Sequence, residues 1–188
     1  MLDYIDEKYK LRQKILIFPF WLKPNLISTF GLFAAVISGF LFYFNYFLAA
    51  GVLVGLNGYF DILDGYMAKK QKKTKLGDFI DHTFDRISDV VILLGISLSS
   101  AVNAVVGLIT IIVVLLVSYL GTQSQAITAD RLYSGIFCRA DRILLIMVAG
   151  FLMPFFESAL YYCVLIILFL SIITFVQRFI LIYKKIRD

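Results

Sequence analysis

The fold is decided by a stretch without any charged side chain, residues 24–60, which reads PNLISTFGLFAAVISGFLFYFNYFLAAGVLVGLNGYF. A helix that crosses a lipid bilayer needs about 20 mostly apolar residues. The stretch is therefore long enough for two such helices, and Asn45 and Tyr46 form the natural turn between them. The sequence thus predicts an antiparallel pair of membrane helices.

Further apolar segments follow along the chain. Residues 90–129 are again uncharged, with a natural break at 99–103, and Glu157 beside Pro154 carries the only charge between 143 and 177. The whole chain is 61% hydrophobic and only 16% charged, whereas about a quarter of the residues of a soluble domain are charged. We predict an all-α integral membrane protein with six transmembrane helices. The expected spans are 25–44, 48–68, 77–98, 103–125, 140–154 and 158–182.

Lysine and arginine occupy alternate connections of this arrangement. They precede the first span, separate the second from the third and the fourth from the fifth, and follow the sixth; the other three connections hold none. The positive-inside rule makes the basic side cytoplasmic. We therefore expect a multi-pass protein of the cell membrane with both termini cytoplasmic. Residues 1–23 mix apolar and basic side chains, which is typical of an amphipathic helix in the membrane interface, with a solvated tail as the alternative; residues 24–188 form the six-helix membrane domain.

Carboxylates gather where the second predicted span ends and the third begins. Asp61 and Asp64 are spaced i, i+3, and Asp81 and Asp85 are spaced i, i+4, so each pair shares one helix face. Because a short loop joins the two helices, both pairs lie at the same depth, near the cytoplasmic surface. Facing carboxylates repel, so a positive charge must lie between them. Arginine or lysine could provide this charge, but hard divalent ions such as Mg²⁺ or Mn²⁺ are the usual partners of all-oxygen sites. Two such ions are also the standard clamp for phosphoryl displacement.

Two other interpretations of these aspartates stay open. The first takes them as solvated charges paired with the basic cluster at 69–75, although four carboxylates at facing helical spacings make this a weak explanation. Acidic residues inside a membrane protein can also mark an ion pathway, as in a small cation transporter. Against a transporter, the acids cluster at one surface instead of extending across the bilayer.

Residues 61–85, DILDGYMAKKQKKTKLGDFIDHTFD, resemble the signature of the CDP-alcohol phosphatidyltransferases. That pattern is D-x-x-D-G-x-x-A-R, a gap, and G-x-x-x-D-x-x-x-D. This chain departs from it in two ways: Lys69 replaces the arginine, and the gap before Gly77 is one residue short. Lysine keeps the charge but lacks the planar fork that binds phosphate with two hydrogen bonds. The matching positions are Asp61, Asp64, Gly65, Ala68, Gly77, Asp81 and Asp85.

The resemblance implies a role for each matched position. It implies transfer of a phospho-lipid group from a CDP-linked lipid to an alcohol, with release of CMP. Asp61, Asp64, Asp81 and Asp85 would bind the metals, and Asp85 would also be the general base. The start of the first span, KPNLIST (residues 23–29), resembles a second family element. The CDP-binding residues implied in this way are Asn25, Thr29, Asp61, Gly65, Ala68, Lys69 and Gly77.

The acceptor is indicated by the segment GIFCRADR, residues 135–142, which resembles the family members that use inositol phosphate. Arg139 and Arg142 are spaced i, i+3 at a helix start, where two guanidinium groups make a good phosphate clamp, and Arg131 is a third candidate. Ordinary topology charges, paired with Asp130 and Asp141, are the alternative. We expect myo-inositol 1-phosphate as acceptor, with glycerol 3-phosphate second and serine less suited. The resemblance to archaeal members implies CDP-archaeol as the lipid donor.

The remaining expectations concern side chains near the acidic face and the partners. His82, the only histidine, is adjacent to Asp81 and is predicted to point off the metal face. Asp89 is predicted to lie near the active face, either paired with Arg86 or involved in acceptor binding. Membrane lipids are expected around the chain. The family resemblance also suggests a homodimer, and no nucleic-acid partner is expected.

Overall fold

The computed structural model of the chain describes residues 24–71, 74–128 and 135–187, all of whose regular structure is α-helical. The predicted interfacial helix at 1–23 lies outside these residues. The helices are α3 (Pro24–Tyr43), α4 (Phe47–Gln71), α5 (Lys75–Ser97), α6 (Ala104–Thr128), α7 (Arg139–Leu152) and α8 (Ala159–Arg187). Each coincides with a predicted span, and α8 continues past the predicted end at 182.

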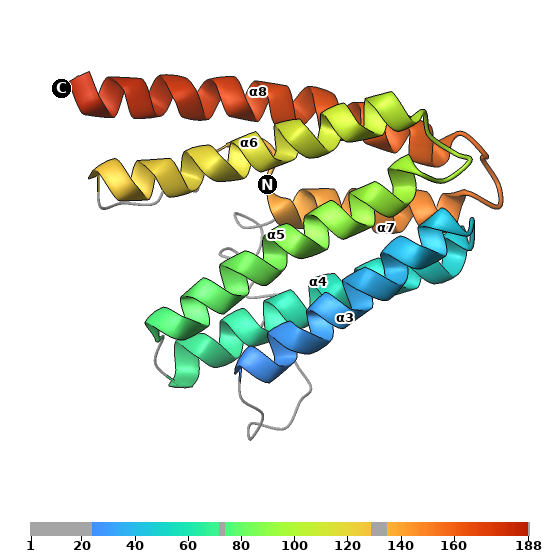
Figure 1. The fold of residues 1–188 in the computed structure, drawn as a ribbon, viewed down its shortest axis with the longest axis horizontal. Helices are drawn as coiled ribbons and strands as arrows, with labels where there is room; N and C mark the ends of the chain where they lie inside the picture. Colours follow the sequence, from blue (N-terminus) through green and yellow to red (C-terminus); the bar gives the residue numbers. More distant parts are fainter. Residues whose placement is uncertain (1–23, 72–73, 129–134, 188) are drawn as a thin grey trace.

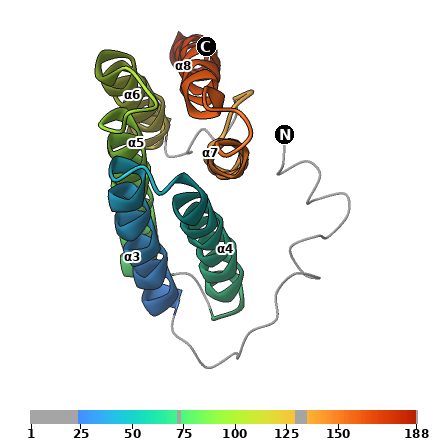
Figure 2. The ribbon, with the colours of Figure 1, turned by 90° about the vertical axis from the view of Figure 1, so that its right-hand side faces the viewer.

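The helices contact one another in a ring, which Figure 2 shows in a view toward the helix ends. Around this ring α3 contacts α4, α4 contacts α7, α7 contacts α8, α8 contacts α6, α6 contacts α5, and α5 returns to α3. The helices α3, α4 and α5 lie side by side, while α6 and α8 form the other side (Figure 1). The C-terminal half of α4 and the N-terminal half of α5 therefore lie at one end of the bundle, called here the acidic end.

Four of the described helices are long and apolar enough to cross a membrane: α3, residues 47–68 of α4, α6 and α8. Large apolar side chains cover their outer surfaces, as on α3, where Phe33 is 60% and Phe40 61% exposed. The chain is thus a multi-pass membrane protein. The two other predicted spans, α5 and α7, do not meet this criterion of length and apolar composition. The N-terminal half of α5 carries many charges, and α7 has 14 residues, or about 21 Å at the usual rise of 1.5 Å per residue.

Small residues allow the helices to approach closely at two crossings. A Cβ atom added to Gly95 of α5 would lie 2.1 Å from the carbonyl oxygen of Gly39 in α3. In the same way, a Cβ atom on Gly150 of α7 would lie 3.0 Å from the Cα of Gly51 in α4. Small residues at such contacts are how membrane helices gain van der Waals packing. These two crossings fix α5 and α7 against the α3–α4 pair.

Candidate functional site

Two helix ends bring the predicted acidic residues together. The Asp61, Asp64 and Asp81 side chains each offer a carboxylate oxygen, and these oxygens lie within 4.8 Å of one another. The predicted convergence of the acidic faces of α4 and α5 is therefore confirmed. Carboxylate oxygens from two helices at this spacing fit a hard divalent cation such as Mg²⁺ or Mn²⁺.

A second group of potential ligands continues along α5. One side-chain atom each from Asp81, His82 and Asp85 also lies within 4.8 Å of the others. The histidine ring nitrogens lie 3.4 Å from an oxygen of Asp78 and 3.9 Å from one of Asp81. The prediction that His82 points away from this face is wrong, because its side chain lies near the carboxylates of Asp78, Asp81 and Asp85.

Asp64 is the most deeply buried of the four predicted metal ligands, with only 5% of its surface exposed. The Ser28 hydroxyl of α3 donates a hydrogen bond of 2.6 Å to its Oδ2 atom. This contact fixes the orientation of the carboxylate toward the other acids. Ser28 is not among the residues predicted from the sequence, although it lies between the two predicted nucleotide ligands of the same helix.

Those two ligands, Asn25 and Thr29, occupy the first turns of α3. The Thr29 hydroxyl donates to the Asn25 carbonyl oxygen at 2.8 Å, a bond within the helix. The Asn25 side-chain oxygen lies 3.4 Å from the position that a Cβ atom on Gly77 would take. The start of α3 therefore lies against the start of α5 beside the acidic residues. Three of the predicted nucleotide-binding positions, Asn25, Thr29 and Gly77, are thus close together.

The glycine after Asp64 faces open space. A Cβ atom added to Gly65 would have no described atom within 4 Å. Contacts among the described residues therefore do not require a glycine here. Ala68 lies one turn further along α4. The backbone of Lys69 continues that helix, whereas its side chain and the whole of Arg131 lie outside the described part of the structure.

The two described arginines of the predicted phosphate clamp turn toward the acids. Nη1 of Arg139 lies 2.7 Å from an oxygen of Asp61 and 2.9 Å from one of Asp85, and its Nε lies 3.4 Å from Asp89. Arg142 donates from Nη2 to Asp89 at 2.6 Å, and both of these residues are buried. Neither arginine forms an ion pair with Asp141 among the described contacts.

Asp141 has a different role at this point of the fold. Its carboxylate accepts a hydrogen bond of 3.0 Å from the backbone nitrogen of Cys138, the residue that precedes α7. A carboxylate at this position satisfies a free N–H group at a helix start. This hydrogen bond fixes the residue at which α7 begins. It thereby also fixes the level along the bundle at which Arg139 and Arg142 lie.

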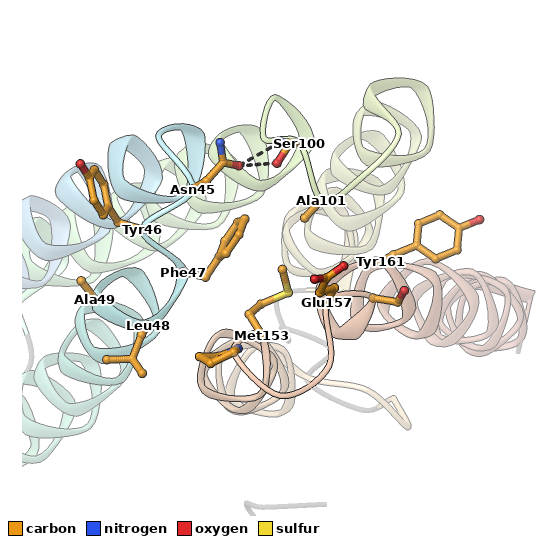
Figure 3. A pocket seen from close by; sticks show the side chains of 12 residues that line it. Asn45, Tyr46, Phe47, Leu48, Ala49, Ser100, Ala101, Met153, Glu157 and Tyr161 are labelled. Carbon is orange, nitrogen blue, oxygen red and sulfur yellow. Dashed lines mark hydrogen bonds between the residues drawn. The ribbon is translucent and has the colours of Figure 1, made fainter.

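A larger hollow lies at the opposite end of the bundle, where three connections between helices meet (Figure 3). Its volume is about 840 Å³. Asn45 and Ser100 close one side, since the Asn45 side-chain oxygen accepts hydrogen bonds from the Ser100 nitrogen and hydroxyl. Glu157 is the charged side chain among its lining residues. A hollow lined by a carboxylate and no cation is a poor site for diphosphates, so the acidic end is the candidate site.

Comparison with known proteins identifies the family. Residues 21–176 match the CDP-alcohol phosphatidyltransferases. The chain belongs to this family. It is a CDP-alcohol phosphatidyltransferase, and the alternative of a cation transporter is set aside.

Two curated relatives of this phosphatidyltransferase are archaetidylinositol phosphate synthases. The protein from Pyrococcus horikoshii is 33% identical over 156 residues, which cover 82% of this chain and 80% of the relative. The protein from Methanothermobacter thermautotrophicus is 30% identical over 145 residues, covering 74% and 72%.

Solved structures of the Mycobacterium tuberculosis phosphatidylinositol phosphate synthase are similar to this phosphatidyltransferase. The structure with CDP-DAG bound has a TM-score of 0.77 at 26% identity and covers 87% of each chain. The structure in complex with manganese and citrate has the same score and identity and covers 86% of this chain and 83% of the other.

Proposed function

We propose that this phosphatidyltransferase transfers the archaetidyl group of CDP-archaeol to myo-inositol 1-phosphate and releases CMP. The observation that carries the proposal is the meeting of two kinds of side chain at one point. Carboxylates suited to divalent ions lie beside the arginines Arg139 and Arg142. The names of the two archaeal relatives point to the same product.

We assign the metal ions to the four aspartates on α4 and α5. When bound, two Mg²⁺ or Mn²⁺ ions neutralise the diphosphate and stabilise the leaving phosphate. Asp64 is held for this task by Ser28, and Asp81 belongs to both groups of potential ligands. The manganese complex of the mycobacterial relative supports the assignment. The proposed ligands are Asp61, Asp64, Asp81 and Asp85.

The proposed reaction is a displacement at phosphorus. The acceptor hydroxyl forms a bond to the phosphorus that carries the lipid, and the bond from that phosphorus to the CMP oxygen breaks. Asp85 takes the hydroxyl proton, and CMP leaves with the bonding electrons. A carboxylate is a weak base, so most of the gain comes from holding the hydroxyl in line with the phosphorus.

We assign the nucleotide to the space above Gly65. Open space at Gly65 and the proximity of Asn25 to Gly77 support this position. The cytidine would lie against backbone there, and the lipid tails would stay between helices. CDP-DAG bound to the mycobacterial relative is a donor of the same class. The proposed CDP-binding residues are Asn25, Thr29, Asp61, Gly65, Ala68, Lys69 and Gly77.

The arginines are proposed to bind the phosphate of the acceptor. A guanidinium group offers paired donors that match phosphate oxygens. An acceptor with its own phosphate needs such groups, whereas free serine does not. Arg139 and Arg142 start α7 beside the reacting end of the site, and Arg131 is proposed as the third member. Glycerol 3-phosphate remains the second candidate for the same reason.

The proposed membrane arrangement has six spans, with α5 and α7 crossing as part of the bundle. Asp85 and Asp89 of α5 point into the bundle, toward Arg139 of α7, and residues after Leu152 would lengthen the path of α7. Both termini and the active site are proposed to be cytoplasmic, where CDP and the phosphorylated acceptor are soluble. Residues 1–23 would lie in the interface, and residues 24–188 would form the catalytic domain.

CMP release by the purified protein tests the proposed function. The assay uses CDP-archaeol with Mn²⁺ and compares myo-inositol 1-phosphate, glycerol 3-phosphate and serine at equal concentrations. We expect the first acceptor to have a kcat/KM at least about tenfold above the others, equivalent to 1.4 kcal/mol of transition-state binding. Asp85→Asn, tested in parallel, controls for contaminating activity. Turnover of serine as fast as that of inositol phosphate would refute the proposed acceptor.

A further inference from the structure

Arg139 occupies the space between the carboxylates instead of extending toward solvent. Its Nη1 lies 2.7 Å from Asp61 and 2.9 Å from Asp85, one residue on each acidic helix. Both of these aspartates are proposed metal ligands. The arginine thus provides the positive charge that facing carboxylates require, at the point where an ion would provide it.

The remaining space at this point is small. The hollow enclosed by α3, α4, α5 and Arg139 has a volume of about 10 Å³. This is on the order of one water molecule. A hydrated or coordinated divalent ion between Asp61 and Asp85 would therefore require the guanidinium to move.

The contacts of Arg139 are suited to being broken. Although Nε and Nη1 are buried at ion-pair distances, neither forms an aligned hydrogen bond in the described part of the chain. Asp89, its third partner, keeps the 2.6 Å hydrogen bond from Arg142 if Arg139 leaves. Displacement of Arg139 therefore leaves no buried carboxylate unpaired, provided that a cation takes its place beside Asp61 and Asp85.

We propose that Arg139 is an internal counter-ion that competes with the metal for Asp61 and Asp85. The inference rests on the proposed metal and acceptor sites and extends them. A metal ion that enters the site releases the guanidinium, which then becomes available to the phosphate of the acceptor. Because linkage is reciprocal, the acceptor phosphate also favours metal binding. The active site would therefore accept its phosphorylated acceptor only after the metal is in place.

Mn²⁺ binding to the purified protein, followed by the electron paramagnetic resonance signal of free Mn²⁺, tests the competition. Removing the Arg139 guanidinium leaves Asp61 and Asp85 without their counter-ion, so a divalent ion no longer has to displace it; a gain of about 10- to 100-fold in affinity corresponds to about 1.4–2.8 kcal/mol. Arg139→Gln should therefore bind Mn²⁺ about 10- to 100-fold more tightly than wild type. Arg142→Gln is the matched control, because it removes the same charge one turn along α7 but from a residue that contacts Asp89. Direct competition would be contradicted if Arg139→Gln bound Mn²⁺ no more tightly than wild type. It would also be contradicted if Arg142→Gln gained as much Mn²⁺ affinity as Arg139→Gln.

Two further measurements keep the result interpretable. In wild type, Mn²⁺ should accelerate modification of Arg139 by phenylglyoxal, measured by mass spectrometry, so the test does not depend on a variant that folds poorly. Unchanged modification of Arg139 with Mn²⁺ would overturn the proposal. Asp61→Asn should weaken Mn²⁺ binding. If it does, and Arg139→Gln still shows no gain, only the competition fails; if Asp61→Asn binds Mn²⁺ like wild type, the proposed metal site itself is wrong.

Discussion

Asp89→Asn is the substitution that separates positioning from catalysis most clearly. Asp89 is buried, with 6% of its surface exposed, and lies 2.6 Å from Arg142 and 3.4 Å from Arg139. It is not among the proposed metal ligands. Its negative charge compensates two guanidinium groups at the start of α7, so its loss should disturb the arginines without removing a ligand of the metals.

The expected loss of stability follows from the burial of the pair. Removing one partner of a buried ion pair costs about 3–5 kcal/mol, because the other charge is left uncompensated. Asparagine can still accept one hydrogen bond from Arg142, so we expect the lower end, about 3 kcal/mol. For a chain of this size each kcal/mol shifts the unfolding midpoint by about 2–4 °C, which gives a decrease of about 6–12 °C.

Thermal unfolding in detergent and steady-state CMP release provide the two readouts. Asp89→Asn should raise the KM for the phosphorylated acceptor about tenfold or more, the equivalent of 1.4 kcal/mol, with little change in the KM for the CDP-lipid. The double variant Asp89→Leu/Arg142→Met should regain stability, because an apolar pair can replace a buried ion pair. It should not regain acceptor affinity. Because this variant also lacks the Arg142 guanidinium, recovery of both together would refute the acceptor-binding role of Arg142 along with the positioning role of Asp89.

Four further substitutions probe separate parts of the site and of the helix packing. Asp85→Asn should abolish CMP release yet keep CDP-lipid binding, measured with a labelled donor; residual turnover near wild type would exclude its role as base. Ser28→Ala removes the 2.6 Å hydrogen bond to Asp64 and should weaken Mn²⁺ binding by about tenfold, at about 1.5 kcal/mol for a bond to a charged group; unchanged affinity would make the contact structural. Gly65→Ala should fold normally and raise the KM for CDP-lipid. Gly95→Ala should lower thermal stability, because its Cβ would lie 2.1 Å from the backbone of α3. A loss of stability in Gly65→Ala, with a raised KM for CDP-lipid in Gly95→Ala, would contradict both assignments.

The helices could be predicted because membrane spans obey a simple rule of length and charge. Uncharged runs of about 20 residues separated by turn residues fix where each helix begins and ends. Asn45 shows the point: it lies in the predicted turn with a positive φ of 64°, a conformation that asparagine tolerates better than most residues. The helices α5 and α7 follow this rule less closely, because α5 is charged and α7 is short. Both carry side chains of the proposed active site, so their sequences serve the site as well as the membrane.

The acidic cluster could also be predicted, since it depends on spacing within two adjacent helices. The arginine contacts could not. Arg142 reaches Asp89 across 53 positions of sequence, and the pairing depends on how α7 enters the bundle. A helical spacing of i, i+3 places Arg139 and Arg142 on one face but does not say what lies opposite. The same limit explains Ser28, which meets Asp64 only because α3 packs against α4, and His82, whose direction depends on side-chain rotation.

The proposed chemistry depends on divalent ions held between the acidic faces of α4 and α5. Crystals grown with saturating Mn²⁺, examined by anomalous scattering at the manganese edge, test it most directly. We expect manganese peaks coordinated by carboxylate oxygens of Asp61, Asp64 and Asp81, with the guanidinium of Arg139 displaced from Asp61. No manganese peak among these carboxylates, with Arg139 still between Asp61 and Asp85, would contradict it.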